Sequence, residues 1–167
     1  GISNGAKTAI DLINDSGGFD GKKLSLIACD TKNDPAVAVP VADHLADIGV
    51  RVMLGALLSD STIQVAETVA TLRDTVLISP ASTSPRIGSI DADTDLIWRT
   101  VPSDDLQARA LVTLIDRAGY GKLLVLYADT AYGNGLRTSM TLYWSELGTR
   151  DVADSATFQS IAYTVEQ

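Results

Sequence analysis

The residues best suited to binding chemistry are hydroxyl side chains that follow two apolar runs. Ser59 lies in GALLSDSTIQ (55–64), where an apolar run gives way to a helical pattern, and Ser82 and Thr83 lie in PASTSP (80–85). A serine at a helix start can cap its own helix, or it can donate to a bound anion together with the backbone N–H groups of the first turn. This stretch alone leaves both roles open.

Both loops would face one crevice if the strands before them are neighbours in a parallel sheet, because ligands bind beyond the carboxyl ends of such strands. There Ser59 would donate to a carboxylate, Thr83 would donate its own hydroxyl hydrogen, and the Ala81 carbonyl would accept from an ammonium group. Helix capping, worth about 1 kcal/mol without any ligand, is the alternative role for these hydroxyls.

The sequence gives weaker signals for catalysis than for ligand binding. The chain has no G-x-S-x-G elbow, P-loop, H-E-x-x-H or paired C-x-x-C motif, and GNG at 133–135 lacks the third glycine of a dinucleotide fingerprint. Asp30, Asp34 and Asp129 follow strand-like runs and could hold a metal, although their position among turn residues favours capping. We therefore expect no enzymatic activity, no cofactor and no metal site.

Composition narrows the class of protein. The 167 residues are 46% hydrophobic and 20% charged, and the net charge of -8 is spread without acidic blocks, which argues against a nucleic-acid surface. No apolar stretch reaches the roughly 18 to 20 residues that span a bilayer, and residues 1–20 lack the layout of a signal peptide. We expect the single cysteine, Cys29, to be a buried apolar residue and the single histidine, His44, to be solvated on a helix.

Helical and strand patterns alternate along the chain, which is typical of an α/β protein with a doubly wound, Rossmann-like parallel sheet. Pro40 falls inside the second helix and predicts a kink or a late start there. The segment 80–95 reads as a long loop. Strands are expected at 22–30, 50–55, 75–79, just before Pro102, at 122–128 and near Val152. Helices are expected at 2–16, after the N-cap Asp34, at 59–73, after the N-cap Ser103 and at 131–147.

Apolar spacing predicts the buried face of each helix. The residues expected on these faces are Ile2, Ala6, Ile10 and Ile13; Val37, Val41, Leu45 and Ile48; Val65, Val69 and Leu72; Leu106, Ala110 and Leu114; and Leu136, Met140, Tyr143 and Leu147.

Several stretches in order carry a family resemblance: GALLSDST, ISPASTSP, WRTVPSDDLQARALV and LYADTAYGNGL. With them the chain resembles the branched-chain amino acid-binding family of ABC-transporter solute receptors, which are type I periplasmic binding proteins. The resemblance implies two Rossmann-like lobes, joined by three crossings, that close on a small ligand. It places Ser59, Ala81, Ser82 and Thr83 at the ligand's carboxylate and ammonium, and Tyr132 as the tyrosine of the second lobe. A core or helix-start aromatic is the alternative role for Tyr132.

Measured against that family, the chain looks like a fragment truncated at both ends. It begins after the position of the family's first strand and stops within the second lobe, so we expect a first lobe at 1–99 and a partial second lobe at 100–167. The missing strand would leave a gap in the sheet with unpaired strand edges on either side. We therefore expect a second chain to fill the gap, in a homodimer or a strand-swapped assembly. We also expect this piece alone to bind amino acids weakly.

The resemblance implies a periplasmic or extracytoplasmic component of an ABC importer that binds an aliphatic amino acid or a similar small polar solute and contacts a permease. The alternative is a ligand-sensing domain of a receptor or regulator with the same fold. A flavodoxin-like enzyme is a third possibility, and it would need a phosphate-binding loop that the sequence does not show.

Overall fold

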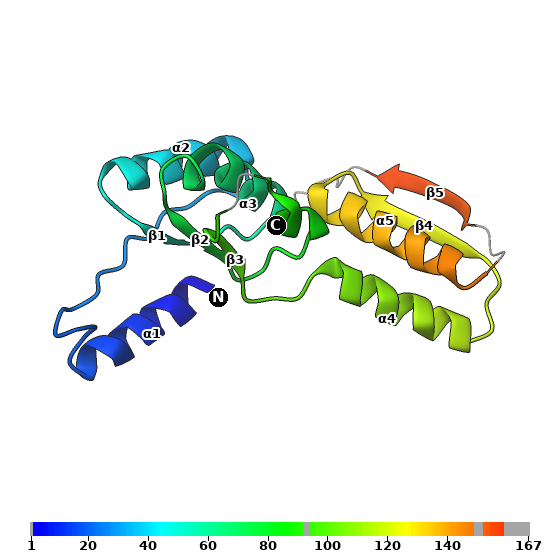
Figure 1. Ribbon diagram of the computed structural model, residues 1–167, viewed down its shortest axis with the longest axis horizontal. Coiled ribbons are helices and arrows are strands. Elements are labelled where there is room, and N and C mark those ends of the chain that lie inside the picture. The colour runs from blue at the N-terminus through cyan, green and yellow to red at the C-terminus, as the bar shows by residue number, and fades with distance from the viewer. Residues whose placement is uncertain (1, 92–93, 149–151, 159–167) are drawn as a thin grey trace, which may run out of the picture.

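The computed structural model describes residues 2–91, 94–148 and, by their backbone alone, 152–158. From α2 onward helices and strands alternate as the sequence predicts, and Figure 1 shows the elements gathered into two units, one from α1 to β3 and one from α4 to β5. The elements are α1 (Ile2–Asp15), α2 (Pro35–Asp47), β1 (Val52–Leu54), α3 (Ser59–Val65), the π-helical turn η1 (Ala66–Ala70), β2 (Val76–Ser79), the 3-10 turn η2 (Pro85–Ser89), β3 (Ile97–Arg99), α4 (Asp104–Arg117), β4 (Leu123–Ala128), α5 (Ala131–Glu146) and β5 (Val152–Phe158).

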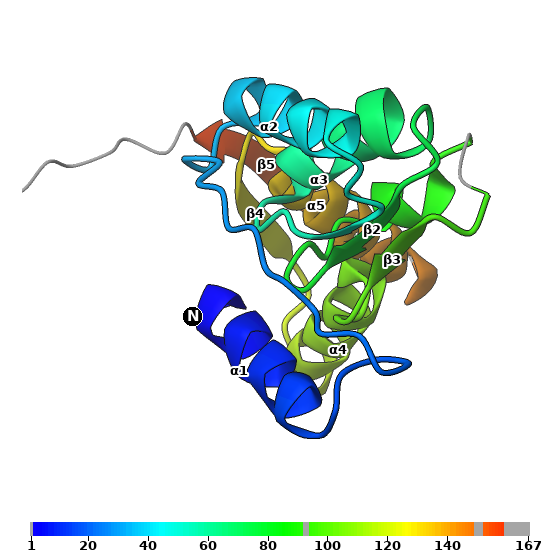
Figure 2. The same ribbon diagram turned by 90° about the vertical axis from the view of Figure 1, so that its left-hand side faces the viewer.

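The first sheet is parallel with the order β1-β2-β3. Val52 pairs with Val76, and Leu77 pairs with Ile97, so β1 and β2 are neighbours, as a shared crevice requires. Helices α2 and α3 lie on one side of this sheet and α1 lies on the other (Figures 1 and 2). Small and branched side chains form the core on the α2 side: Ala38, Ala42, Ala46, Met53, Val65, Ala66, Val69, Ala70, Leu77 and Ile90.

The expected strand at 22–30 is not formed. Residues 25–29 have no backbone hydrogen bond to another described segment, and Leu24 is held instead by the Asn14 side chain, which donates to its carbonyl and accepts from its N–H. A strand exists only through its hydrogen-bonded neighbour, and β1 is not paired on this side. Cys29 is consequently exposed, which contradicts the expectation that it is buried.

The second unit is a parallel pair, β4 with β5, covered by α4 and α5. Side chains alternate along β4: Leu123 and Val125 are buried, whereas Leu124 and Leu126 are exposed. The buried pair packs with Ala108, Val112, Met140 and Trp144 in one core.

The residues that cap the starts of α2 and α4 were predicted correctly. Asp34 caps α2 by accepting from the Ala36 N–H, and Ser103 caps α4 by accepting from the Asp105 N–H. Pro40 neither interrupts α2 nor delays its start, and His44 is exposed as expected.

The helix faces were predicted less well. Ala38, Ala42 and Ala46 are the buried residues of α2, whereas Ile48 is exposed. Leu72 lies after the helical segment has ended and is also exposed. In α4 the face that contacts the core is centred on Ala108 and Val112, so Leu106, Ala110 and Leu114 point to solvent, which shifts the predicted face.

Two further features complete the description of the fold. The long segment after β2 contains the short 3-10 turn η2, so it is not wholly a loop. Among the described residues, no helix has both the length and the apolarity needed to cross a bilayer.

Candidate functional site

The loops after β1 and β2 meet, as the sequence predicted. The Ser84 N–H donates to the Ser59 hydroxyl at 3.3 Å, and the Thr62 and Ser82 hydroxyls are hydrogen-bonded at 2.7 Å. The Ser79 hydroxyl donates to the Ala56 carbonyl at 2.8 Å. These bonds bring the two polar loops together at the carboxyl ends of neighbouring parallel strands, where open α/β sheets bind ligands.

Ser59 does not cap its own helix. It is the first residue of α3, and the N-cap position is Leu58, which makes no side-chain cap bond. The Ser59 hydroxyl is 4% exposed and accepts from Ser84, so its own hydrogen is left without an acceptor among the described residues. A hydroxyl in this state can still donate to a bound anion.

Ser82 is buried between the two loops. Its side chain is 1% exposed, and its hydroxyl bonds with Thr62 and lies near the carbonyls of Ala56 and Leu57. The Ser82 hydroxyl therefore joins the two loops from within. Ala81, next to it, stays partly exposed at the surface of the same loop.

Thr83 is fixed by residues from two other elements. Its hydroxyl donates to a carboxylate oxygen of Asp104 at 2.9 Å, and its carbonyl accepts from the Asp104 N–H at 2.9 Å. The Arg99 guanidinium donates to the carbonyls of Thr83 and Ser84 at 3.1 and 2.9 Å. The hydroxyl hydrogen that we expected Thr83 to offer a ligand is thus directed at Asp104, and the hydroxyl oxygen keeps its capacity to accept.

Asp104 is a buried carboxylate beside this loop. The residue is 1% exposed, and its Oδ1 atom has no hydrogen-bond partner. Burial raises the pKa of Asp104 above its ordinary value, as does the nearby Asp105, while the hydrogen bond from Thr83 and the charge of Arg99 act in the opposite direction.

Tyr132 reaches the same region from the second unit. It is the second residue of α5, and its neighbour Ala131 is bonded to both loops of the first unit: the Ala131 N–H donates to the Asp60 carboxylate, and the Ala131 carbonyl accepts from the Ser84 hydroxyl at 3.1 Å. The Tyr132 side chain is exposed. The start of α5 is therefore positioned beside Ser59 and its loop.

The GNG stretch serves close packing. A Cβ atom at Gly133 would collide with the backbone of Ala128, and one at Gly135 would come within 2.8 Å of Pro85 Cδ and 3.3 Å of Ser84 Oγ. The first glycine lets α5 approach β4, and the second lets α5 approach the loop of the first unit.

The three acidic residues considered for a metal make local bonds instead. Asp30 accepts from the Lys32 N–H, Asp34 caps α2, and Asp129 accepts from the Asn134 side chain. Within residues 2–91 and 94–148, no three His, Cys, Asp or Glu side chains gather as a metal site.

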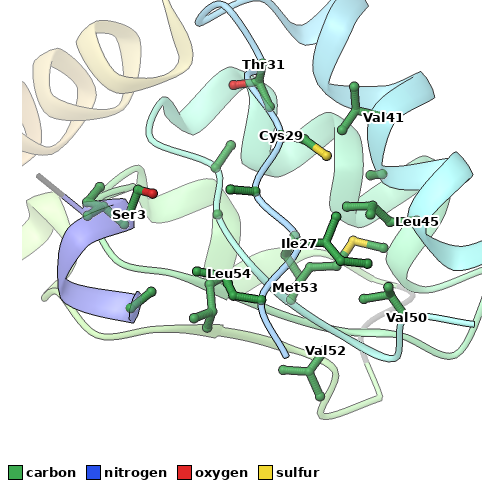
Figure 3. Close-up of a pocket in the computed structure, with 18 of the residues that line it drawn as sticks. Ser3, Ile27, Cys29, Thr31, Val41, Leu45, Val50, Val52, Met53 and Leu54 are labelled. Atoms are coloured by element: carbon green, nitrogen blue, oxygen red, sulfur yellow. The ribbon is translucent and has the colours of Figure 1, made fainter. Parts of the chain in front are cut away.

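A separate apolar cavity of about 650 Å³ lies between α1, residues 24–31, α2 and β1. Figure 3 shows Ile27 and Cys29 on one side of it and Val52, Met53 and Leu54 on another. Its walls are mainly apolar, with the hydroxyls of Ser3, Ser25 and Thr31 among the lining side chains, and Cys29 is the titratable residue that lines it. We call this cavity the strand gap.

Sequence reasoning proposed Ser59, Ala81, Thr83 and Tyr132 for this region, and it did not single out Asp104 or Arg99, which hold the loop of Thr83. An aspartate in the first turn of a helix is common, so the type and position of Asp104 gave no sign of its burial. Only the packing of α4 against the loop after β2 distinguishes it from Asp105.

Comparisons with known proteins show the family to which this chain belongs. The family model described as "Periplasmic binding protein" matches residues 1–161. The chain is 31% identical over 154 residues to Leu/Ile/Val-binding protein homolog 1 of Brucella abortus, which covers 90% of this chain and 40% of that protein. It is 33% identical over 137 residues to the leucine-, isoleucine-, valine-, threonine-, and alanine-binding protein of Pseudomonas aeruginosa, which covers 81% of this chain and 36% of that protein.

A solved structure shows the same fold with a ligand. The ABC transporter substrate-binding protein from Desulfitobacterium hafniense in complex with Leu is 29% identical and superposes with a TM-score of 0.79, covering 95% of this chain and 47% of that one. The chain thus spans less than half the length of the relatives that it matches.

Proposed function

This chain belongs to the periplasmic binding protein family, and we propose that it is part of the extracytoplasmic solute-binding component of an ABC importer that takes up an aliphatic amino acid or a similar small polar solute. Its relatives are named as binding proteins for leucine, isoleucine and valine. Residues 1–99 would form one lobe and 100–167 part of the other, with the ligand between them. The role is binding and delivery, without catalysis.

One observation carries the proposal: the Ser84 N–H donates to the Ser59 hydroxyl and thereby joins the loops that follow two adjacent parallel strands. In this arrangement the Ser59 hydrogen and the backbone N–H groups that begin α3 would hold the ligand carboxylate. The Ala81 carbonyl and the Thr83 hydroxyl oxygen would accept from the ligand ammonium. Acceptors and donors would then match the two ends of a zwitterion.

Tyr132 would close the site from the second lobe. It starts α5 next to Ala131, which is bonded to Asp60 and Ser84 of the first lobe. An exposed tyrosine in this place can cover an aliphatic side chain with its ring, which favours amino acids with apolar side chains.

The test is isothermal titration calorimetry of L-leucine with the whole gene product that contains this sequence. We expect a dissociation constant in the micromolar range or tighter, and a loss of at least about tenfold in the variant Ser59→Ala. A thermal-shift panel of amino acids then ranks ligands. A protein that no amino acid stabilises or binds contradicts the proposal.

The alternative is a ligand-sensing domain of a receptor or regulator with the same fold. Both roles predict ligand binding, so calorimetry does not separate them. Genes for a permease and an ATPase beside this one favour the importer, while a DNA-binding or membrane-spanning segment elsewhere in the gene product favours the sensor.

For this chain as it stands, we propose that a second copy covers the strand gap. β1 is an edge strand, and apolar side chains on both walls, among them Ile27 and Leu54, are exposed. Unpaired strand edges beside apolar surface are the usual site of strand exchange and dimerisation. The oligomeric state in solution tests this.

A further inference from the structure

Building on the proposed amino acid ligand, we propose that Asp104 is a positioning residue of the binding site. Its buried carboxylate takes the Thr83 hydroxyl hydrogen and so turns the hydroxyl oxygen toward the ligand, and its charge favours a ligand that presents a protonated amine. Asp104 thereby determines specificity without being one of the loop residues that the ligand contacts.

The geometry fixes Thr83 at two points. The Asp104 carboxylate accepts from the Thr83 hydroxyl at 2.9 Å, and the Asp104 N–H donates to the Thr83 carbonyl at 2.9 Å. A hydroxyl has one hydrogen and two lone pairs, so a threonine whose hydrogen is committed can only accept from a ligand. A cationic donor suits that oxygen better than a carboxylate does.

The charge of Asp104 is poorly compensated within the described residues. Its Oδ1 atom is buried and has no partner, and the nearest guanidinium, that of Arg99, donates to the carbonyls of Thr83 and Ser84. A buried carboxylate is stabilised by a cation brought close to it. A ligand ammonium on the far side of Thr83 would supply that positive charge.

A purely structural role as a helix cap does not account for this burial. Ser103 already caps α4, since its hydroxyl accepts from the Asp105 N–H. Asp105 in turn accepts from the Ser103 and Ser139 hydroxyls, which ties it to α5. The two adjacent aspartates therefore act separately, and Asp105 is a matched control for Asp104.

The experiment measures L-leucine affinity by calorimetry in the whole gene product for wild type, Asp104→Asn, Thr83→Val and Asp105→Asn. Asparagine keeps the shape and can still accept from Thr83, so Asp104→Asn isolates the charge. We expect Asp104→Asn to lose about tenfold or more in affinity and Asp105→Asn to stay within about twofold. In the double variant Thr83→Val/Asp104→Asn, the loss of leucine binding free energy should be smaller than the sum of the losses in the two single variants.

The pH dependence of leucine affinity distinguishes this role of Asp104 from a purely structural one. As the pH falls from neutral, neither charged group of leucine titrates at first, whereas Asp104, whose pKa burial raises, takes up its proton at a higher pH than an exposed aspartate does. The groups facing Asp104 are the Thr83 hydroxyl, the Arg99 guanidinium and the Asp105 carboxylate. We expect wild-type affinity to weaken as the pH falls, Asp105→Asn to weaken in parallel, and Asp104→Asn to be weak throughout with a flat profile.

The outcomes separate the two proposals. Leucine binding that is unchanged in Asp104→Asn, or an acid-induced loss that persists in that variant, overturns the role of Asp104 and leaves the proposed function intact. A folded wild-type protein that binds neither leucine nor any other amino acid overturns both.

Discussion

The Asp60 carboxylate accepts from the backbone N–H of Ala131, at 3.0 and 3.1 Å for its two oxygens, although the residues are 71 positions apart. Asp60 is in the first turn of α3, and Ala131 is the first residue of α5. A carboxylate at a helix N-terminus is favoured by the free N–H groups and the helix dipole. This bond therefore joins the two units beside the candidate site.

We predict that Asp60→Ala weakens the contact between the two units. The variant loses a charge-assisted cap of α5 worth about 1 kcal/mol, because no other described side chain accepts from the Ala131 N–H. Small-angle X-ray scattering should show a larger radius of gyration, and leucine affinity in the whole gene product should fall several-fold.

Asp129→Ala is the control for that variant. Asp129 lies just before α5 but bonds to Asn134 within the same unit. Its removal should leave the radius of gyration unchanged. Equal expansion in both variants would show that the Asp60 bond does not hold the units together.

Gly133→Ala should reduce stability, whereas Gly135→Ala should separate the two units. The added methyl at Gly133 meets the Ala128 backbone within the second unit, so Gly133→Ala should lower the melting temperature strongly, since backbone cannot move aside cheaply. The methyl at Gly135 meets Pro85 and Ser84 of the first unit, so Gly135→Ala should leave the melting temperature nearly unchanged and push the units apart. Circular dichroism melting and X-ray scattering on both variants decide this.

Ser59→Ala should reduce leucine affinity about tenfold, because it removes the proposed donor to the carboxylate. It also leaves the Ser84 N–H without its acceptor, which should lower stability by roughly 1–3 kcal/mol. Ser61→Ala is the control two residues along the same helix. The Ser61 hydroxyl is buried without a partner, so its removal should be neutral or stabilising and should not change affinity.

Asp104→Asn should stabilise the fold at neutral pH while it weakens binding. Burial raises the folded-state pKa of Asp104, so between its unfolded and folded pKa values the native state binds more protons than the unfolded state. Stability from this group is therefore greatest at low pH and is lost as the pH rises through that window. Urea melts at several pH values should show that the advantage of Asp104→Asn over wild type in free energy of unfolding grows as the pH rises through that window. A variant less stable than wild type at pH 7 contradicts the assignment.

The sequence predicted the parts of the fold that local chemistry determines. Asp34 and Ser103 were identified as caps because capping depends on a side chain and the next few backbone groups. The meeting of Ser59 with the loop after β2 followed from strand adjacency in a parallel sheet. Both kinds of inference need only a short stretch or a general rule of topology.

Features that depend on tertiary partners were not predictable. Residues 22–30 have the composition of a strand, but nothing in that composition says whether a neighbouring strand is present. Leu106 and Leu114 were expected inside because of their type, whereas the packing of α4 against α5 buries Ala108 and Val112. The burial of Asp104 likewise depends on how α4 meets the loop after β2.

The last prediction concerns association of the 167-residue chain through the strand gap. The exposed edge of β1 and the apolar walls beside it should pair two copies, so light scattering should give a dimer at micromolar concentration. Leu54→Lys places a charge on this edge and should shift the protein to monomer, because charged side chains on edge strands prevent pairing. Leu72→Lys, at an exposed leucine outside the gap, should remain dimeric. The Cys29 thiol, which lines the gap, should react with a thiol reagent more slowly in the dimer than in Leu54→Lys. A cooperative, monomeric wild-type protein with a freely reactive Cys29 would show that no second copy covers the gap.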